Sequence, residues 1–307
     1  MVQYRTLRVS QNVQEILKTE STGIIHSVFN SSFNLLFGER LIHVGPIENG
    51  LAPFGIGLFK QDTIHLIKHL NQNDTVYLDL HTKNLNLAQN HTLILENSNI
   101  FNPFLHTKVV SQDVLLNNRS AMIRELIVRK WIGGLVDSEQ EQETILQYLQ
   151  QDHSEMADVN SRLIQEIIAL ESLVKNRADK QAKDIFDFWL GRGPGLTPSG
   201  DDMMTGICAS LYLLEKSDHT EFISLLVSYL YTYGEKRTTP VAYEYLLYAT
   251  KGEFHSTILN MCSALLQADQ NNLEDALEEM EQIGHTSGVD TLLGILIGLK
   301  AGITFKS

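Results

Sequence analysis

The sequence contains the same eight-residue element twice, in identical register. Ser-Gly-x-Asp-x-x-x-Gly occurs at Ser199 to Gly206 and again at Ser287 to Gly294. An apolar run with helical spacing follows each copy, so each copy predicts a helix start with serine as the N-cap. Small residues recur four apart along both helices and would let them cross closely. The repeat therefore predicts two helices with matching starts and a shared packing face.

The starts of these helices are candidates for an anion-binding active site. Glycines let main-chain N–H groups turn toward a ligand, and the unpaired N–H groups of a first helical turn bind anions. If the helices pack with both starts at the same end, their partial positive charges add in one place and suit a doubly charged ligand. If they pack antiparallel, this hypothesis fails. The alternative is a pair of capped helices, one of them entered through the rigid glycine- and proline-rich turn that precedes Ser199.

The predicted site residues fall into two groups. Proton transfer is assigned to His285, Asp202 and Asp290, because imidazole and carboxyl groups in such positions can act as acid or base. Anion binding is assigned to residues of both motifs and of a nearby basic cluster: Arg192, Gly193, Gly195, Thr197, Ser199, Gly200, Arg237, Thr238, Thr286, Ser287 and Gly288.

Two alternatives concern these same segments. Asp201, Asp202 and Asp290 could instead hold Mg²⁺ against a phosphate, although the sequence contains no dedicated metal cage and identifies no other cofactor. The cluster Lys236-Arg237-Thr238-Thr239-Pro240 could be an exposed basic loop followed by an N-cap with proline at the first helical position.

The spacing of apolar residues changes near residue 110. Before it, short apolar runs at 24–29, 41–44, 56–59, 75–78 and 92–95 are separated by turn residues, which predicts an antiparallel sheet or small barrel. After it, apolar residues recur three and four apart, which predicts helices. We therefore expect an α+β protein, with a β-rich domain at 1–110 and an all-helical domain at 111–307 that carries the paired motifs.

Composition narrows the class of protein. A chain of 307 residues favours two domains, and its net charge of -13 argues against a surface that collects nucleic acid or anionic lipid. Cys208 and Cys262 lie in apolar helical surroundings, which is typical of reduced core thiols. The N-terminus lacks the apolar region of a signal peptide, and the apolar runs are too short to span a bilayer. These features predict a soluble, cytoplasmic protein.

Two sequence segments resemble those of a known family. The segment from Gly193 to Asp202, combined with the segment from Gly284 to Thr291, resembles a bacterial family long labelled a domain of unknown function. That family includes the AllH-type subunit of oxamate carbamoyltransferase, and the resemblance extends from the strand near His26 to the final helix. It implies a component of a multi-subunit transferase of allantoin degradation and purine catabolism. The implied reaction converts oxalurate and phosphate to oxamate and carbamoyl phosphate, with other carbamoyltransferase subunits as partners. The resemblance does not assign catalytic residues.

Three functions are therefore compared. The first is an enzyme subunit that binds small anions such as phosphate, carbamoyl phosphate, oxamate or oxalurate. The second is a metabolite-binding or scaffolding subunit without catalytic residues, and the third is a Mg²⁺-dependent phosphotransferase or hydrolase. The chain lacks a Walker-type Gly-Lys-Ser/Thr motif, which weakens any claim that it binds nucleotides in the ordinary way. The paired motifs and the resemblance favour the enzyme subunit.

Overall fold

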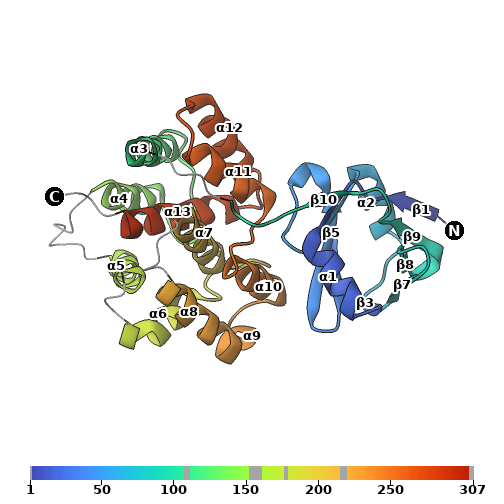
Figure 1. The fold of residues 1–307 in the computed structure, drawn as a ribbon. Helices are drawn as coiled ribbons and strands as arrows, with labels where there is room; N and C mark the ends of the chain where they lie inside the picture. Colours follow the sequence, from blue (N-terminus) through green and yellow to red (C-terminus); the bar gives the residue numbers. More distant parts are fainter. Residues whose placement is uncertain (1, 107–110, 152–160, 176–178, 215–219, 304–307) are drawn as a thin grey trace. The chain divides into compact units, whose positions relative to one another are not determined.

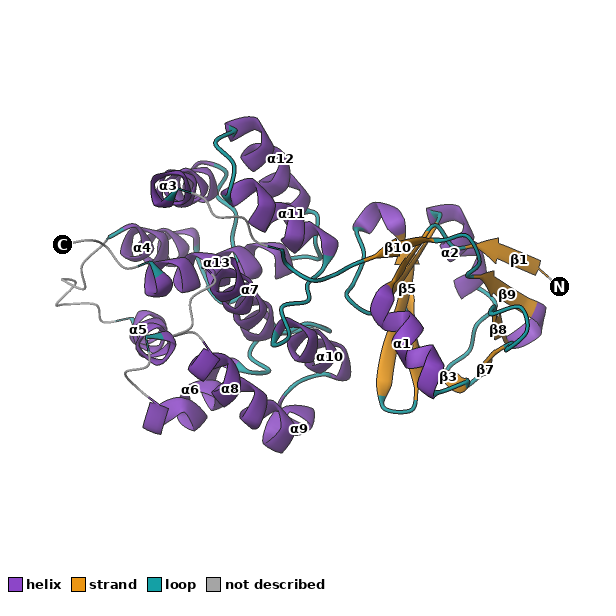
Figure 2. Ribbon diagram, viewed as in Figure 1, coloured by secondary structure: helices purple, strands orange, loops and turns teal. Residues whose placement is uncertain are grey.

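The computed structural model describes residues 2–106, 111–151, 161–175, 179–214 and 220–303. The chain forms two compact units, one of Met1–Phe104 with Phe254–Ser256 and the other of Leu105–Glu253 with Thr257–Ser307. The expected boundary between 110 and 111 adjoins residues 107–110, which lie outside the described part of the chain. The predicted α+β class is confirmed, because a β-rich unit is followed by a helical one (Figure 2).

The first unit is built on one ten-stranded sheet. In spatial order its strands are β1 (Val2–Arg5), β9 (His91–Ile94), β8 (Leu85–Leu87), β7 (Thr75–Leu78), β3 (Thr22–Val28), β4 (Phe33–Phe37), β5 (Arg40–Pro46), β6 (Gly55–Leu58), β2 (Arg8–Ser10) and β10 (Asn99–Phe101).

This sheet curls until its two ends approach each other. Strands β1 and β2 lie toward opposite ends of the spatial order, yet only Thr6 and Leu7 separate them in sequence. The N–H group of Thr6 donates to the Ile94 carbonyl at 3.2 Å, and that of Leu7 donates to the Gly57 carbonyl at 2.9 Å. The curled sheet encloses an apolar core that includes Ile25.

The pairing of the strands is mixed. Neighbours joined by short turns, such as β3 with β4 and β7 with β8, are antiparallel as expected. The pairs β1–β9, β2–β10 and β5–β6 are parallel. Turn residues in the sequence reveal hairpins, whereas parallel pairs need longer connections and leave no local signal. Two helices, α1 (Gln11–Thr19) and α2 (Lys60–Ile67), also belong to this unit.

The second unit is helical. Its helices are α3 (Gln112–Val128), α4 (Glu139–Gln150), α5 (Arg162–Val174), α6 (Ala182–Trp189), α7 (Ser199–Leu214), α8 (Thr220–Tyr229), α9 (Glu235–Arg237), α10 (Pro240–Ala249), α11 (Ser256–Leu265), α12 (Gln270–Glu281) and α13 (Ser287–Gly302), with a π-helical turn at Leu230–Gly234. Figure 1 shows α7 and α13 together at the centre of this unit. Both are apolar around most of their circumference, which is typical of helices buried on all sides.

One buried cation ties the central pair to a neighbour. The Lys300 ammonium of α13 donates to the Tyr148 carbonyl at 2.6 Å and to the Gln151 carbonyl at 2.8 Å. These carbonyls end α4, where the partial negative charge of a helix favours a cation. Lys300 therefore fixes the end of α4 against α13.

Two further expectations can be compared with the structure. Cys208 and Cys262 are free and buried, which confirms that they are core thiols. Within the described residues, every helix is too short or too polar to cross a bilayer.

Candidate functional site

Helices α7 and α13 lie parallel, with their starts at the same end. A Cβ atom added to Gly294 would lie 3.0 Å from Met203 Cα, near the start of α7. Further along both helices, a Cβ on Gly298 would lie 3.2 Å from the Ile207 carbonyl. Because contact positions advance together along the two helices, they run in the same direction. The condition stated for a shared site, helix starts at one end, is therefore met.

The last glycine of each motif copy, Gly206 or Gly294, makes this close approach possible. We call these two the distal glycines, and Gly200 and Gly288 the proximal ones. A side chain on Gly206 would collide with the Thr291 carbonyl, and one on Gly294 would collide with the Met203 carbonyl. The two contacts are equivalent under the repeat, since each pair of partners is shifted by the same number of residues. The distal half of the repeated motif is thus a packing device.

A buried cluster forms where α13 meets the start of α7. It contains Asp290, Ser199 and Thr286, and Asp290 is fully buried. The Gly134 N–H group donates to Asp290 Oδ2 at 3.1 Å. Burial raises the pKa of Asp290, while the hydroxyls of Ser199 and Thr286 and the N–H groups of Gly134 and Leu135 oppose that rise. Among the described residues, Asp290 Oδ1 has no hydrogen-bond partner.

Two consecutive glycines cover this buried cluster. A Cβ on Gly134 would lie 2.8 Å from Thr286 Oγ1 and would collide with Ser199 Oγ. A Cβ on Gly133 would collide with the Asp290 carboxylate. The segment therefore needs two residues without side chains to lie against the helix starts, and it seals the buried cluster from solvent.

An outer cluster forms where α7 meets the start of α13. It contains Thr197, Asp202 and Ser287, each of them half-buried, and the hydroxyls of Thr197 and Ser287 lie 3.1 Å apart. Burial raises the pKa of Asp202 well above its usual range, with the Ser287 hydroxyl opposing the rise and nearby carboxylates adding to it. Asp202 Oδ2 has no hydrogen-bond partner in the described part of the chain. Tyr245 of α10 lies close enough for Asp202 to raise its pKa, after the larger effect of burial.

The two clusters are related by the sequence repeat and are formed crosswise. Ser199 of α7 approaches Asp290 of α13, and Ser287 of α13 approaches Asp202 of α7. Their surroundings differ, because the glycine segment seals the first cluster while the second remains partly accessible. A small molecule can therefore reach the outer cluster more readily, and Asp202 is its titratable group.

The proximal glycines of the repeat are also packed. The Gly200 N–H group donates to the Arg192 carbonyl at 2.9 Å, and the Gly288 N–H group donates to the Ile283 carbonyl at 3.2 Å. Side chains at these positions would collide with the carbonyls of Trp189 and Met280. Both amides are therefore engaged within the fold, and the hydroxyl and carboxyl side chains are left to make contacts with a ligand.

The loop that leads into α7 carries the remaining residues of the first motif. Gly193 and Gly195 adopt positive φ angles of 107° and 103°, a backbone region that favours glycine. A Cβ on Gly193 would lie 2.9 Å from the Ser199 nitrogen, so this turn rests on the helix start. Arg192 is exposed and its guanidinium lies 4.5 Å from the centre of the Phe188 ring. Arg192 is thus an accessible cation beside the start of α7.

The basic cluster before α10 is engaged in internal contacts. Arg237 donates to Asp187 Oδ1 at 2.8 Å and to the Tyr229 hydroxyl at 3.0 Å. Thr239 caps α10, with Pro240 at the first helical position, as the alternative interpretation expected, whereas Lys236 and Arg237 belong to helix α9 and not to a loop. Arg237 is therefore not oriented toward the two clusters.

Asp201 differs from its neighbour Asp202. The Gly191 N–H group donates to Asp201 Oδ1 at 3.0 Å, and the Thr238 hydroxyl donates to Oδ2. Burial raises the pKa of Asp201 to about 6. One oxygen holds the loop that enters α7 and the other holds the segment before α10, which is a structural role. Within the described residues, no group of three or more His, Cys, Asp or Glu side chains is placed to hold a metal ion.

The residues that lie at the two clusters coincide only in part with the predicted site residues. His285 is exposed in the turn before α13, one residue away from the buried cluster. Gly133, Gly134 and Tyr245 lie at the clusters but were not predicted. Consecutive glycines between two helical patterns were a usable signal for the first two, since such a pair marks a loop that requires close backbone approach. The position of Tyr245 on α10 gave no such signal.

Two family models match the chain. The model of the oxamate carbamoyltransferase subunit AllH matches residues 189–299, which include both copies of the repeat. The model of the AllH family N-terminal domain matches residues 5–100, the curled sheet. No solved structure matches the chain. The chain therefore belongs to the AllH family of oxamate carbamoyltransferase subunits.

Proposed function

We propose that this chain binds the reacting anions of an oxamate carbamoyltransferase at the paired starts of α7 and α13, and transfers a proton there through Asp202. The description of the family as a subunit implies that the chain works with other carbamoyltransferase subunits. One observation carries the proposal. Asp202 is a half-buried residue at the positive ends of two parallel helices, its pKa is strongly raised, and its buried Oδ2 has no hydrogen-bond partner among the described residues.

The electrostatics of the outer cluster support anion binding. Each helix start carries a partial positive charge equivalent to about half an elementary charge, and parallel packing adds the two. The raised pKa favours the protonated form of Asp202, and a neutral carboxyl group does not repel an incoming anion. The Thr197 and Ser287 hydroxyls can donate to anionic oxygens, and Arg192 adds a full positive charge on the loop that enters α7.

The protonated carboxyl group also suits the reaction implied by the family. In the direction from oxalurate, a phosphate oxygen attacks the ureido carbonyl carbon and forms the new C–O bond. The C–N bond to the oxamate nitrogen then breaks, and the leaving nitrogen must gain a proton. Asp202 donates that proton and becomes a carboxylate, which regains it in the reverse direction or from solvent. A positioned acid of this kind contributes typically 10² to 10⁴-fold to a rate.

The test measures carbamoyl phosphate formation from oxalurate and phosphate by the chain co-expressed with its partner subunits. Asp202→Asn should lower kcat by at least roughly 100-fold, since the amide cannot donate a proton to the leaving group. Asp201→Asn is the matched control, because it changes the adjacent acid on the same helix. We expect it to keep most of the activity.

Binding of phosphate separates the enzymatic function from a binding function. Phosphate should protect both wild type and Asp202→Asn from thermal unfolding, because the variant retains the helix starts and the hydroxyls. Protection combined with full activity of Asp202→Asn would rule out the acid role and favour a metabolite-binding subunit. Loss of activity on addition of a chelator, with rescue by Mg²⁺, would instead support the metal-dependent alternative.

A further inference from the structure

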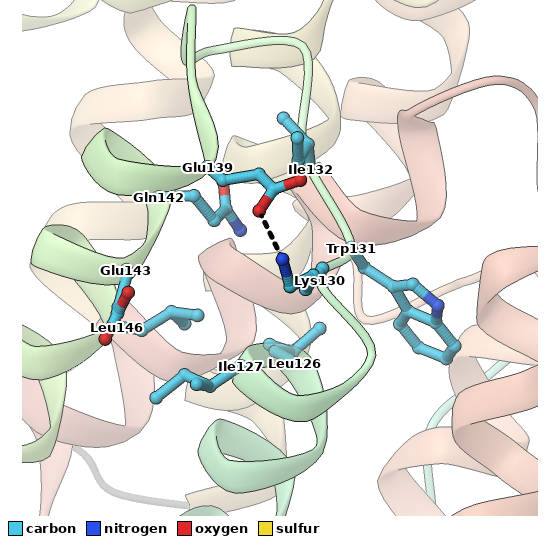
Figure 3. A pocket seen from close by; sticks show the side chains of 9 residues that line it. All are labelled: Leu126, Ile127, Lys130, Trp131, Ile132, Glu139, Gln142, Glu143 and Leu146. Carbon is cyan, nitrogen blue, oxygen red and sulfur yellow. Dashed lines mark hydrogen bonds and ion pairs between the residues drawn. The ribbon is translucent and has the colours of Figure 1, made fainter.

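A pocket lies beside the segment that continues into Gly133 and Gly134. It has a volume of about 210 Å³ and is bordered by α3, α4 and the segment that joins them (Figure 3). Its apolar wall consists of Leu126, Ile127, Ile132 and Leu146. Trp131 lines it as well. The pocket is therefore large enough for a small organic molecule with an apolar part.

One polar group in this pocket lacks a partner. Gln142 is 3 % exposed, and its Oε1 accepts from the Gly133 N–H group at 3.4 Å. That contact fixes the orientation of the amide, since its NH₂ group would not face another N–H donor. The NH₂ group consequently faces the other way, and among the described residues its nitrogen has no hydrogen-bond partner. Figure 3 shows this nitrogen directed toward the Lys130–Glu139 ion pair.

The charges around the pocket restrict the ligand. Lys130 Nζ and Glu139 Oε2 lie 2.9 Å apart at the mouth, and Glu143 also lines the pocket. One cation and two carboxylates give a net negative surrounding, which repels a carboxylate ligand. An ammonium ligand is attracted but offers no acceptor to the buried Gln142 NH₂ group. A neutral amide offers both a carbonyl acceptor for Gln142 and N–H donors for Glu139.

We propose that this pocket binds a small neutral amide, meaning a carboxamide or urea-type group that carries a short apolar substituent. The carbonyl oxygen of the ligand accepts from Gln142 Nε2, and its N–H groups face the Glu139 carboxylate. The substituent packs against the four aliphatic side chains. A buried donor that lacks a partner is costly, so the first of these contacts stabilises the complex beyond the burial of apolar surface.

The chain provides its own probe of this binding. It contains two tryptophans, Trp131 at the pocket and Trp189 in the core of the helical unit. Their two indole N–H resonances in a ¹⁵N-labelled sample are assigned with Trp131→Phe. Titration with isovaleramide should shift the Trp131 resonance and leave that of Trp189 in place. Isovalerate and isopentylamine share the carbon skeleton, and we expect the affinity of each to be lower by a factor of about ten or more.

Variants of Gln142 decide which group recognises the ligand. Gln142→Glu keeps the acceptor for Gly133 but removes the donor, and should weaken isovaleramide about tenfold. Gln142→Met removes both, while Gln150→Met makes the same change at the exposed end of α4 and should bind as wild type. An unchanged Trp189 resonance shows that each variant is folded.

Three results with isovaleramide and its analogues would overturn the proposal. These are the absence of any Trp131 shift, equal binding of the amide and the carboxylate, or undiminished binding by Gln142→Glu. Oxamate and phosphate provide an additional comparison, because their negative charge should exclude them from this pocket. A shift of Trp131 by those anions as strong as that by isovaleramide would also contradict it.

Discussion

Alanine at Gly206 or Gly294 should destabilise the helical unit by forcing α7 and α13 apart. A Cβ on Gly206 would lie 2.9 Å from Ile295 N and 3.0 Å from Thr291 C, whereas ordinary contacts begin at 3.4 Å. These atoms belong to the main chain and cannot rotate away, and the Thr291 carbonyl oxygen lies closer still, so the helices must separate. Overpacking of this kind costs about 1–3 kcal/mol, and we expect the upper end.

Helix propensity offsets part of this cost. Alanine is favoured over glycine within a helix by up to about 1 kcal/mol, which leaves a net loss on the order of 2 kcal/mol. For a unit the size of the helical one, that loss corresponds to a decrease in Tm of roughly 4–8 °C. The assay is thermal unfolding of each variant, followed by the helical circular dichroism signal.

The double variant provides an internal control. Once one alanine has separated the helices, the second meets less resistance, so the combined loss should be smaller than the sum of the two single losses. Single variants that are as stable as wild type, or more stable, would mean that only the propensity gain operates. The close parallel contact would then be incorrect, and with it the shared helix starts.

Three further predictions follow from other residues. The pKa of Asp201 rises from 3.8 to about 6 on folding, so the folded state binds this proton more tightly than the unfolded state. The resulting stabilisation is complete below about pH 4 and is lost as the pH rises through 6. The free energy of urea unfolding should fall by about 3 kcal/mol more over that range in wild type than in Asp201→Asn. Lys300→Met leaves carbonyl oxygens at the end of α4 unpaired and should cost about 1–3 kcal/mol in thermal or urea unfolding, whereas Lys18→Met on an exposed surface should cost little. Burial raises the pKa of the Cys208 and Cys262 thiols to about 12, so a thiol reagent should label them only on unfolding; rapid labelling of the native chain would contradict their placement.

Local patterns predicted part of the first unit. The run at 75–78 corresponds to β7, because its apolar and β-branched residues lie between turn signals. Strands β1 and β10 are short and expose most of their residues, and each forms a parallel pair with a strand that hairpin turns do not reveal. Their positions depend on closure of the whole sheet, which a local window of sequence does not contain.

Local sequence patterns also predicted only part of the candidate site. The repeat predicted two helix starts and identified Asp202 and Asp290, since serines and nearby acids recur at fixed spacing. The prediction that the serines are N-caps was wrong, because Ser199 and Ser287 are the first residues of their helices and Thr286 is the N-cap of α13. The contact of Gly134 with Asp290 joins residues that are 156 positions apart, and no local pattern encodes such a pair. The difference between a sealed and an accessible cluster depends on that contact.

The crosswise construction of the clusters has a consequence for the order of folding. Each cluster takes a serine from one helix and an aspartate from the other, and the contact between Thr197 and Ser287 closes a loop of 90 residues. Closing such a loop costs entropy before any contact offsets it, so the clusters should assemble late. During synthesis, α7 emerges from the ribosome well before its partner α13. Neither carboxyl group can acquire its native surroundings until then, which makes the chemistry of this chain conditional on the completion of its helical core.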